Sequence, residues 1–492
     1  MPVPSMQALT LASLQNAVSN DLYADLASDR CREFALCAAR VLARLRADAE
    51  TAPTLAAARL TVWRELARST SDPPAPNGSH AQPVEPLAAL NEAVGRIGRD
   101  IDQRSGEVAY LDALAAPTSE AAVQFSRTLA AARDYLDAYE EALPAAGISA
   151  DRPAEDTETV RSKLSRYLIE RFPELPADPI HTFRIVPGGR GKETTLFELV
   201  SNSVLPTRLV LRRDVSNSPT GTAVYAEFPL LRKLEELGLP VPRPIVAEQD
   251  PSHLGGGFMI VTEAVGARRG GELFAELNDL SRLDASFGPE LTRALARLHT
   301  LTEHPSGAAL GGHHAGSTPL EAVRQFQGLW RSLKHRPAFS VATDLGFAWL
   351  LSHPLPADRP RRLVHGDVGL HNILVREGKL AALLDWELTH LGDPAEDLGY
   401  IRAPLMQHLL PWGEFVNVYT AAGGDPRACD RHAVDWYSVW AHTRNSIYVA
   451  MHYEWAATGQ RKDIECFNAG IDFFSRTQLY IVRELELAWG AR

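Results

Sequence analysis

The segment LVHGDVGLHNILV, residues 363–375, places polar side chains that can act in catalysis or ligand binding between two apolar runs. Asp367 and Asn372 lie in the loop, and the second apolar run turns at REGK and returns as a strand that ends at Asp385. A hairpin brings the start of one strand beside the end of the next. We therefore expect three oxygen-bearing side chains to lie close together at one end of this hairpin.

Oxygen ligands of this kind suit Mg²⁺, which proteins bind through one or two carboxylates together with substrate phosphates. A further carboxylate beside such a metal can accept a proton from an alcohol. An elaborate hairpin without chemistry is the alternative interpretation. The residue types favour a loop that acts on a phosphate compound.

The same residues resemble a known family. HGDVGLHN followed by LLDWELTHLGDPAEDLGY is similar to the aminoglycoside phosphotransferase-like kinases, relatives of the protein kinases. The resemblance implies Asp367 as the catalytic base and Asn372 and Asp385 as ligands of Mg²⁺, with ATP as co-substrate. We expect His365 to stabilise the loop, and a proton carrier is the alternative.

A glycine-rich turn upstream agrees with this resemblance. PGGRGKETTLFEL stands where the family has the turn between its first two strands, which implies that Gly188 and Gly189 lie over the nucleotide phosphates. A Walker P-loop is excluded, because its Gly-Lys pair must be followed by Ser or Thr and here Glu193 follows.

Arg212, in LVLRR, occupies the position of the family's phosphate-pairing lysine, and Glu227 matches the helix glutamate that pairs with it. Arginine differs from lysine, but a guanidinium can bind phosphate oxygens with two parallel hydrogen bonds while a carboxylate holds it. A surface ion pair of little energetic value is the alternative.

VLRR, GLPVPRPI, LDWELTHLGDP and RNSIYVAMHYEWAATGQ resemble one branch most, the phosphotransferases fused to, or encoded near, acyl-CoA dehydrogenases. That branch implies a hydroxyl group on an acyl-CoA or similar metabolite as the phosphoryl acceptor. The whole resemblance covers about residues 157–492.

The elements that must position these residues form three regions. Residues 1–150 are rich in Ala, Leu, Arg and Glu at helical spacing, which predicts an all-α N-terminal domain. Residues 157–266 contain strand-like runs and one helix that stops at Gly238, which predicts a small β-rich lobe. Helices dominate residues 267–492 apart from the hairpin. The predicted fold class is α+β, a two-lobed protein-kinase-like fold behind a helical domain.

Composition narrows the function classes. The 492 residues carry a formal net charge of −11, which argues against a nucleic-acid partner. No apolar run is long enough to span a membrane, and no signal peptide is recognisable at the start of the sequence. Four cysteines do not complete a zinc-binding set. We expect a cytoplasmic protein that binds ATP and a small-molecule hydroxyl acceptor, with its oligomeric state open.

Two alternatives stay open for the function. Phosphorylation of an aminoglycoside or another antibiotic is one, although residues 405–492 hold ten acidic against eight basic side chains and so form no acidic region for a polycation. A nucleotide-binding pseudokinase with a regulatory role is the other, and only Arg212 favours it. Arg444 either meets an anionic acceptor or forms a buried structural ion pair.

Overall fold

The computed structural model describes residues 130, 157–186, 192–214, 220–271, 280–305, 317–336, 340–408, 410–458, 460, 470 and 473–490. The predicted helical domain of residues 1–150 lies outside the described residues, except for residue 130. The predicted phosphate-binding residues Gly188 and Gly189 lie outside them as well. The two predicted lobes fall largely within the described part.

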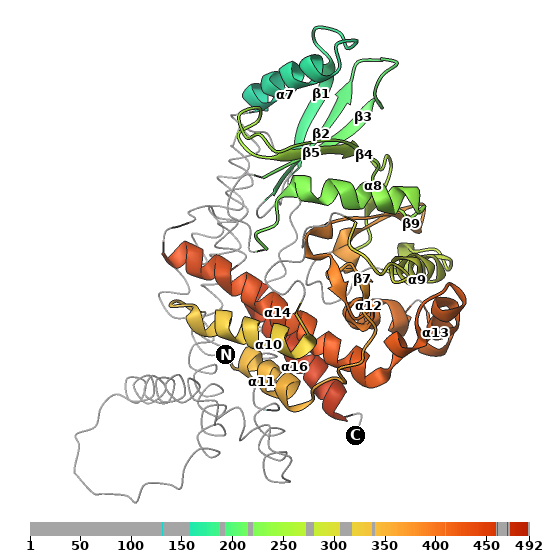
Figure 1. Ribbon diagram of the computed structural model, residues 1–492, viewed down its shortest axis with the longest axis vertical. Helices are drawn as coiled ribbons and strands as arrows, with labels where there is room; N and C mark the ends of the chain where they lie inside the picture. Colours follow the sequence, from blue (N-terminus) through green and yellow to red (C-terminus); the bar gives the residue numbers. More distant parts are fainter. Residues whose placement is uncertain are drawn as a thin grey trace, which may run out of the picture.

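The amino-terminal lobe is an antiparallel five-stranded sheet in the order β1-β2-β3-β5-β4. Its strands are β1 (Ile180–Val186), β2 (Lys192–Leu199), β3 (Arg208–Asp214), β4 (Pro244–Glu248) and β5 (Phe258–Thr262). Two helices accompany the sheet, α7 (Thr157–Arg171) and α8 (Phe228–Glu236). In Figure 1, α7 lies on the outer side of the sheet and α8 lies between the sheet and the helical part of the molecule.

Each face of this sheet is covered by one helix. Leu209 and Leu211 of β3 belong to the apolar cluster that includes α7, whereas Met259 and Val261 of β5 belong to the cluster that includes α8. Successive side chains of a strand point to opposite faces. Arg212 therefore lies on the same face as α8, opposite Leu211, and points toward the second lobe.

The helix predicted after β3 is divided. Val224–Glu227 form a short 3₁₀ helix, η2, and α8 begins at Phe228 with Pro229 in its first turn, where its missing N–H is tolerated. Gly238 follows the end of α8 with φ +67°, a conformation that favours glycine. The helix was predicted to end at Gly238, and α8 ends two residues earlier, at Glu236.

Helices dominate the second lobe, as predicted. Its helices are α9 (Phe287–Leu298), α10 (Pro319–Ser332), α11 (Val341–Ser352), α12 (Ala395–His408), α13 (Trp412–Ala421), α14 (Arg431–Ala457) and α16 (Phe474–Gly490). Trp436 and Trp440 of α14 are almost completely buried in the apolar core. Among the described helices, none is both long and apolar enough to span a membrane.

Short strands carry the predicted catalytic loop. β7 (Arg362–Val364) precedes the loop and pairs with β10 (His390–Gly392), while β8 (Ile373–Arg376) and β9 (Lys379–Leu383) form the predicted hairpin. β6 (Arg268–Arg269) pairs with the other edge of β8. The backbone N–H of Leu384 also donates to the carbonyl of Asn372 at 2.8 Å, so the end of the hairpin is tied to the loop.

Candidate active site

Asp367 lies in the loop after β7 and is held by several donors. Asn372 Nδ2 donates to Asp367 Oδ2 and to the backbone carbonyl of Asp367, both at 2.9 Å. His371 Nε2 lies 3.7 Å from the carboxylate, and the hydroxyl of Tyr400 is hydrogen-bonded to it. Burial by itself would raise the pKa of Asp367, but His371, Arg444 and Tyr400 together hold it well below the usual range of an aspartate.

A buried carboxylate fixes the backbone of the catalytic loop. Asp397, at the start of α12, is fully buried and accepts hydrogen bonds from the N–H groups of His365 (2.7 Å) and Gly366 (2.8 Å). Gly366 has φ +81°, and a Cβ there would lie 2.5 Å from the carbonyl oxygen of Leu388. The loop therefore requires glycine at 366, and Asp397 holds it next to Asp367.

Arg444 of α14 has a structural role in this site. Its side chain is completely buried, and its guanidinium donates to Glu396 Oε1 at 2.9 Å and to the carbonyl of Gly366 at 2.6 Å. Of the two interpretations from the sequence, these contacts favour the buried ion pair. Arg444 thereby ties the long helix α14 to the residue before Asp367.

His365 joins the catalytic loop to the segment that ends at Asp385. Its ring is buried, its Nε2 lies 2.9 Å from the carbonyl of Leu384, and it packs on Trp386 with ring centroids 4.4 Å apart. This placement agrees with the loop-stabilising interpretation. Asp385 itself is 35% exposed.

Asp385 has a left-handed backbone, with φ +64° and ψ +66°. Such a conformation is unusual for a residue other than glycine and is found often at functional sites. Asp385 follows β9 and Asn372 precedes β8, so the hairpin brings the two predicted metal ligands to the same end. In the part of the chain described here, no group of three or more His, Cys, Asp or Glu side chains forms a metal site.

The predicted pair of Arg212 and Glu227 exists, and it reaches the second lobe. Arg212 Nη1 donates to Glu227 Oε2 at 2.8 Å, and Arg212 Nη2 donates to Asp385 Oδ1 at 3.0 Å. Glu227 is completely buried, which rules out a surface pair of little value. Burial opposes the charge of Arg212, but Glu227 and Asp385 raise its pKa above the ordinary value.

Lys192 is a site residue that was missed at the sequence level. It lies at the start of β2, is 7% exposed, and its Nζ lies 3.1 Å from Glu227 Oε1 and 2.5 Å from Glu387 Oε2. Glu387 follows Asp385 by two residues and also accepts from the hydroxyl of Thr220 at 3.1 Å. Burial, together with the charge of Asp385, raises the pKa of Glu387 to about 7 despite the neighbouring lysine.

The register of two strands places Lys192 in the site. The Gly-Lys pair does not fit a Walker loop, so the motif by itself gives the lysine no role. Thr194 pairs with Arg212 and Lys192 pairs with Asp214, so Lys192 lies on the face of the sheet that carries Arg212.

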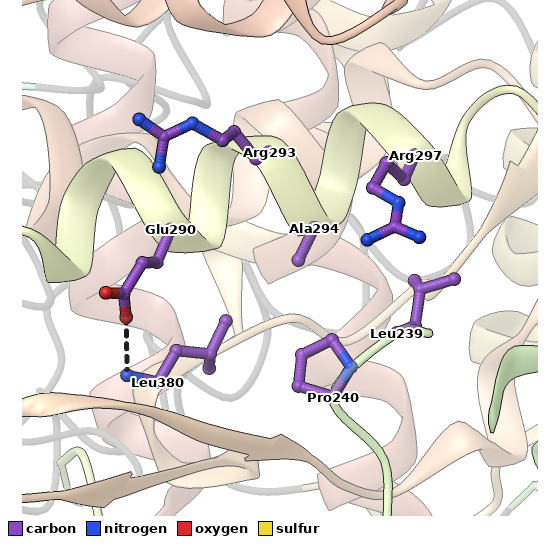
Figure 2. A pocket seen from close by; sticks show the side chains of 7 residues that line it. All are labelled: Leu239, Pro240, Glu290, Arg293, Ala294, Arg297 and Leu380. Atoms are coloured by element: carbon purple, nitrogen blue, oxygen red, sulfur yellow. Dashed lines mark hydrogen bonds between the residues drawn. The ribbon is translucent and has the colours of Figure 1, made fainter. Parts of the chain in front are cut away.

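The end of α8 and the loop after it are also attached to the second lobe. Figure 2 shows a pocket of about 260 Å³ where Leu239 and Pro240 face α9 and β9. Arg297 of α9 donates to the carbonyl of Leu237 at the end of α8, and the N–H of Leu383 donates to the carbonyl of Pro240 at 2.7 Å. This pocket is lined by Leu239, Pro240, Glu290, Arg293, Ala294, Arg297 and Leu380, and contains none of the predicted site residues.

Comparison with known proteins decides the family. The model of the phosphotransferase enzyme family matches residues 182–433, just over half of the chain. The chain belongs to the phosphotransferase enzyme family. This membership confirms the predicted phosphotransferase and the two-lobed kinase-like fold, and a nucleoside triphosphate with Mg²⁺ is the co-substrate that the family uses.

Relatives of this phosphotransferase have longer chains. Acyl-CoA dehydrogenase family member 11 of Rattus norvegicus is 26% identical over 242 residues, which cover 48% of this chain and 30% of the rat protein. Family member 10 of Mus musculus is 29% identical over 198 residues, 39% of this chain and 18% of the mouse protein. The probable acyl-CoA dehydrogenase IBR3 of Arabidopsis thaliana is 26% identical over 341 residues, 61% of this chain and 40% of that protein. The chain thus matches less than half the length of each relative.

Solved structures similar to this phosphotransferase include a putative aminoglycoside phosphotransferase from Ralstonia eutropha, with 17% identity and a TM-score of 0.48 over 66% of this chain and 98% of that chain. The GDP complex of aminoglycoside 2'-phosphotransferase-IIIa has 14% identity and a TM-score of 0.43 over 64% of this chain and 98% of that chain.

Proposed function

We propose that this phosphotransferase is an ATP-dependent small-molecule kinase that transfers the γ-phosphoryl group of ATP to a hydroxyl group. The observation that carries the proposal is the ion pair between the lobes, Arg212 Nη2 to Asp385 Oδ1 at 3.0 Å. Through this ion pair Arg212 of the sheet contacts Asp385, which follows strand β9 of the hairpin. The other strand of the hairpin, β8, begins directly after Asn372, at the end of the loop that contains Asp367.

Asp367 is the proposed base, and its surroundings define how it acts. Its low pKa keeps it ionised at neutral pH, so it is a weak base with little driving force for proton transfer. In phosphoryl transfer through a loose transition state the nucleophile needs orientation more than early deprotonation. The donors Asn372 and Tyr400 hold the carboxylate in one orientation. We infer that Asp367 orients the acceptor hydroxyl and takes its proton late.

Asn372 and Asp385 would hold Mg²⁺, and their chemistry fits this ion. Nδ2 of Asn372 is engaged by Asp367, which leaves its Oδ1 as the atom that can face a cation. Asp385 is partly exposed and supplies a carboxylate. Mg²⁺ usually takes one or two protein oxygens and completes its shell with phosphates and waters. When bound, the metal neutralises phosphate charge, and Arg212 adds a further positive charge beside it.

The acceptor is proposed to be a hydroxyl group on an acyl-CoA or a related metabolite. The relatives named acyl-CoA dehydrogenases support this class, because their names point to acyl-CoA chemistry. The near balance of ten acidic and eight basic residues in residues 405–492 offers no preference for a polycationic antibiotic. We also propose that the boundary between the two lobes divides the chain into residues 157–266 and 267–492, and that the protein is cytoplasmic.

ATP consumption with Mg²⁺ tests this function. We expect turnover with one or more hydroxyacyl-CoAs in a panel that also contains aminoglycosides, sugars and amino alcohols. The variant Asp367→Asn keeps the shape of the side chain and removes proton acceptance, so its turnover should fall by about 10²- to 10⁴-fold while Mg-ATP affinity changes little. Asp358→Asn is the matched control, since Asp358 is an exposed loop aspartate.

Two results would contradict the proposal. Turnover of Asp367→Asn equal to that of the wild type would remove Asp367 from the chemistry. Binding of Mg-ATP without phosphoryl transfer to any acceptor, together with no ATP hydrolysis, would favour a pseudokinase. Turnover confined to aminoglycosides would keep the kinase and replace the acceptor.

A further inference from the structure

We propose that Lys192 of β2 is a second phosphate-binding cation of this site, which acts with Arg212 of β3 on the triphosphate of the nucleotide. The inference rests on the proposed function and deepens it, because it adds a specificity-determining residue to the same cleft. It stands on the position of Lys192, on how Glu227 is shared, and on the hydrogen-bonding capacity of the two cations.

The position of Lys192 follows from the sheet. β2 and β3 are neighbours, and the register that pairs Lys192 with Asp214 and Thr194 with Arg212 puts both cations on one face. Glu227 of η2 contacts both cations on this face, which is directed toward the second lobe, as Figure 1 shows for the sheet as a whole. Lys192 also directly follows residues 187–191, where the resemblance implied a turn over the phosphates.

Glu227 is shared between the two cations in a specific way. Its Oε1 lies 3.1 Å from Lys192 Nζ, and its Oε2 lies 2.8 Å from Arg212 Nη1. A single arginine can satisfy both oxygens of a carboxylate with its two parallel donors. Here each cation uses one oxygen, so each keeps donors for another partner.

Those other partners are carboxylates of the second lobe. Arg212 reaches Asp385 at 3.0 Å and Lys192 reaches Glu387 at 2.5 Å, so the two cations make equivalent contacts with two carboxylates that are two residues apart. Asp385 is the proposed metal ligand. Two positive charges therefore line the place where the phosphates of a Mg-nucleotide would lie.

The charge balance explains why the second cation is useful. Three carboxylates, Glu227, Asp385 and Glu387, surround the two cations, and Arg212 alone would be outnumbered by them beside an incoming polyanion. Lys192 reduces this excess. An ammonium has three donors, and the contacts with Glu227 and Glu387 leave a third for a phosphate oxygen. Lysine binds phosphate as a point charge, whereas arginine adds a planar geometry, so the two cations are complementary.

The structural alternative is an ion pair that only closes the two lobes. Such a pair would affect every ligand of the cleft to the same degree. A phosphate-binding lysine affects triphosphate and leaves adenosine binding unchanged. The ratio of Mg-ATP affinity to adenosine affinity therefore separates the two roles.

Titration calorimetry with Mg-ATP and with adenosine tests the proposal on the full chain. We expect Lys192→Met to weaken Mg-ATP binding by about 10- to 100-fold, the value of one hydrogen bond between charged groups, and to leave adenosine affinity unchanged. Lys192→Arg restores the charge and should recover part of the loss. Lys163→Met is the matched control, because Lys163 is an exposed residue of α7.

Lys192→Met leaves the buried Glu227 and the partly buried Glu387 short of a positive charge, which can prevent folding. The double variant Lys192→Met with Glu387→Gln removes one charge of each sign and keeps the balance. Compared with Glu387→Gln alone, it should still lose about 10- to 100-fold in Mg-ATP affinity with adenosine unaffected.

Equal losses for Mg-ATP and adenosine, or no loss for either, would overturn the assignment of Lys192 and leave the kinase proposal intact. Failure of the wild type to bind Mg-ATP would overturn the proposed function itself. The two failures are distinguishable because the first is measured in variants of a protein that binds nucleotide.

Discussion

Asp397→Asn tests whether the buried carboxylate positions the catalytic loop. Asp397 Oδ2 accepts from the N–H of His365 and lies 3.0 Å from Nε2 of His299, while Oδ1 accepts from the N–H of Gly366 at 2.8 Å. An asparagine can place its amide oxygen at the Oδ2 position and keep two contacts. Its NH₂ group then faces the N–H of Gly366, and that hydrogen bond is lost.

The magnitude follows from this one contact. A hydrogen bond to a charged group contributes about 1.5–3 kcal/mol. For a folded region of this size, each kcal/mol corresponds to about 2–4 °C in Tm, so we expect Tm to fall by about 3–12 °C. Gly366 is bonded to Asp367, and a displacement of about 1 Å in a catalytic group costs about 100-fold in rate. We therefore expect kcat to fall by up to about 100-fold.

Thermal denaturation and initial rates at varied ATP concentration measure both effects. The KM for ATP should change little, because Asp397 lies in the second lobe and its hydrogen bonds are to His365, Gly366 and His299. Asp358→Asn is the control for replacing an exposed aspartate. A lower Tm with unchanged kcat would show that Asp397 stabilises the fold without positioning Asp367, and would refute the reasoning.

The remaining predictions concern the metal ligand, the Arg212 pair and pH. Asp385→Ala removes a charged ligand, so calorimetry should show weaker binding of ATP with Mg²⁺ and little change without it; identical affinities with Mg²⁺ would exclude Asp385 as a ligand. Arg212→Ala should reduce both Mg-ATP affinity and rate, with partial recovery in Arg212→Lys. The effects of Arg212→Ala and Glu227→Ala on turnover should be less than additive in the double variant. Additive, near-neutral effects would remove Arg212 from the site. Burial lowers the pKa of His390, but the neighbouring Glu396 outweighs it and raises that pKa above 6.5. Folding therefore favours the charged form of His390, and the resulting stabilisation is complete below pH 6.5 and is lost as pH rises through the raised pKa. In the wild type, denaturant titration should show a decrease in unfolding free energy above pH 6.5, and His390→Gln should flatten this decrease. Parallel curves for the two proteins would contradict this assignment.

Local sequence was sufficient for much of the fold. Strand-like runs in residues 157–266 could be predicted because apolar runs bounded by glycine, proline or polar residues are a local signal, and the structure has a five-stranded sheet there. The shortness of β4 and the two prolines before it hide that strand in the sequence. The pairing of β7 with β10 was missed because each strand has three residues and finds its partner across the catalytic loop.

In the candidate site, too, some residues could be predicted from local sequence and others could not. Asp367, Asn372 and Asp385 could be predicted because they lie within 19 residues of one another on a single hairpin, so their proximity is a local property. Arg212 and Glu227 came from the resemblance, and the structure places them together at 2.8 Å. Their roles stay proposals.

The amino-acid sequence by itself determined the strand-rich and helical regions, the hairpin and the order of its polar residues, because these depend on periodicity and on short-range spacing. The two-lobed class came from the resemblance to a known family. Only the tertiary structure decided that Lys192 enters the cleft and that Asp397 holds the loop from 30 residues away. Strand register and helix packing set those contacts, and neither leaves a signal within one segment of the chain. For the same physical reason, the surroundings of Asp367, and with them its low pKa, could be read only from the folded molecule.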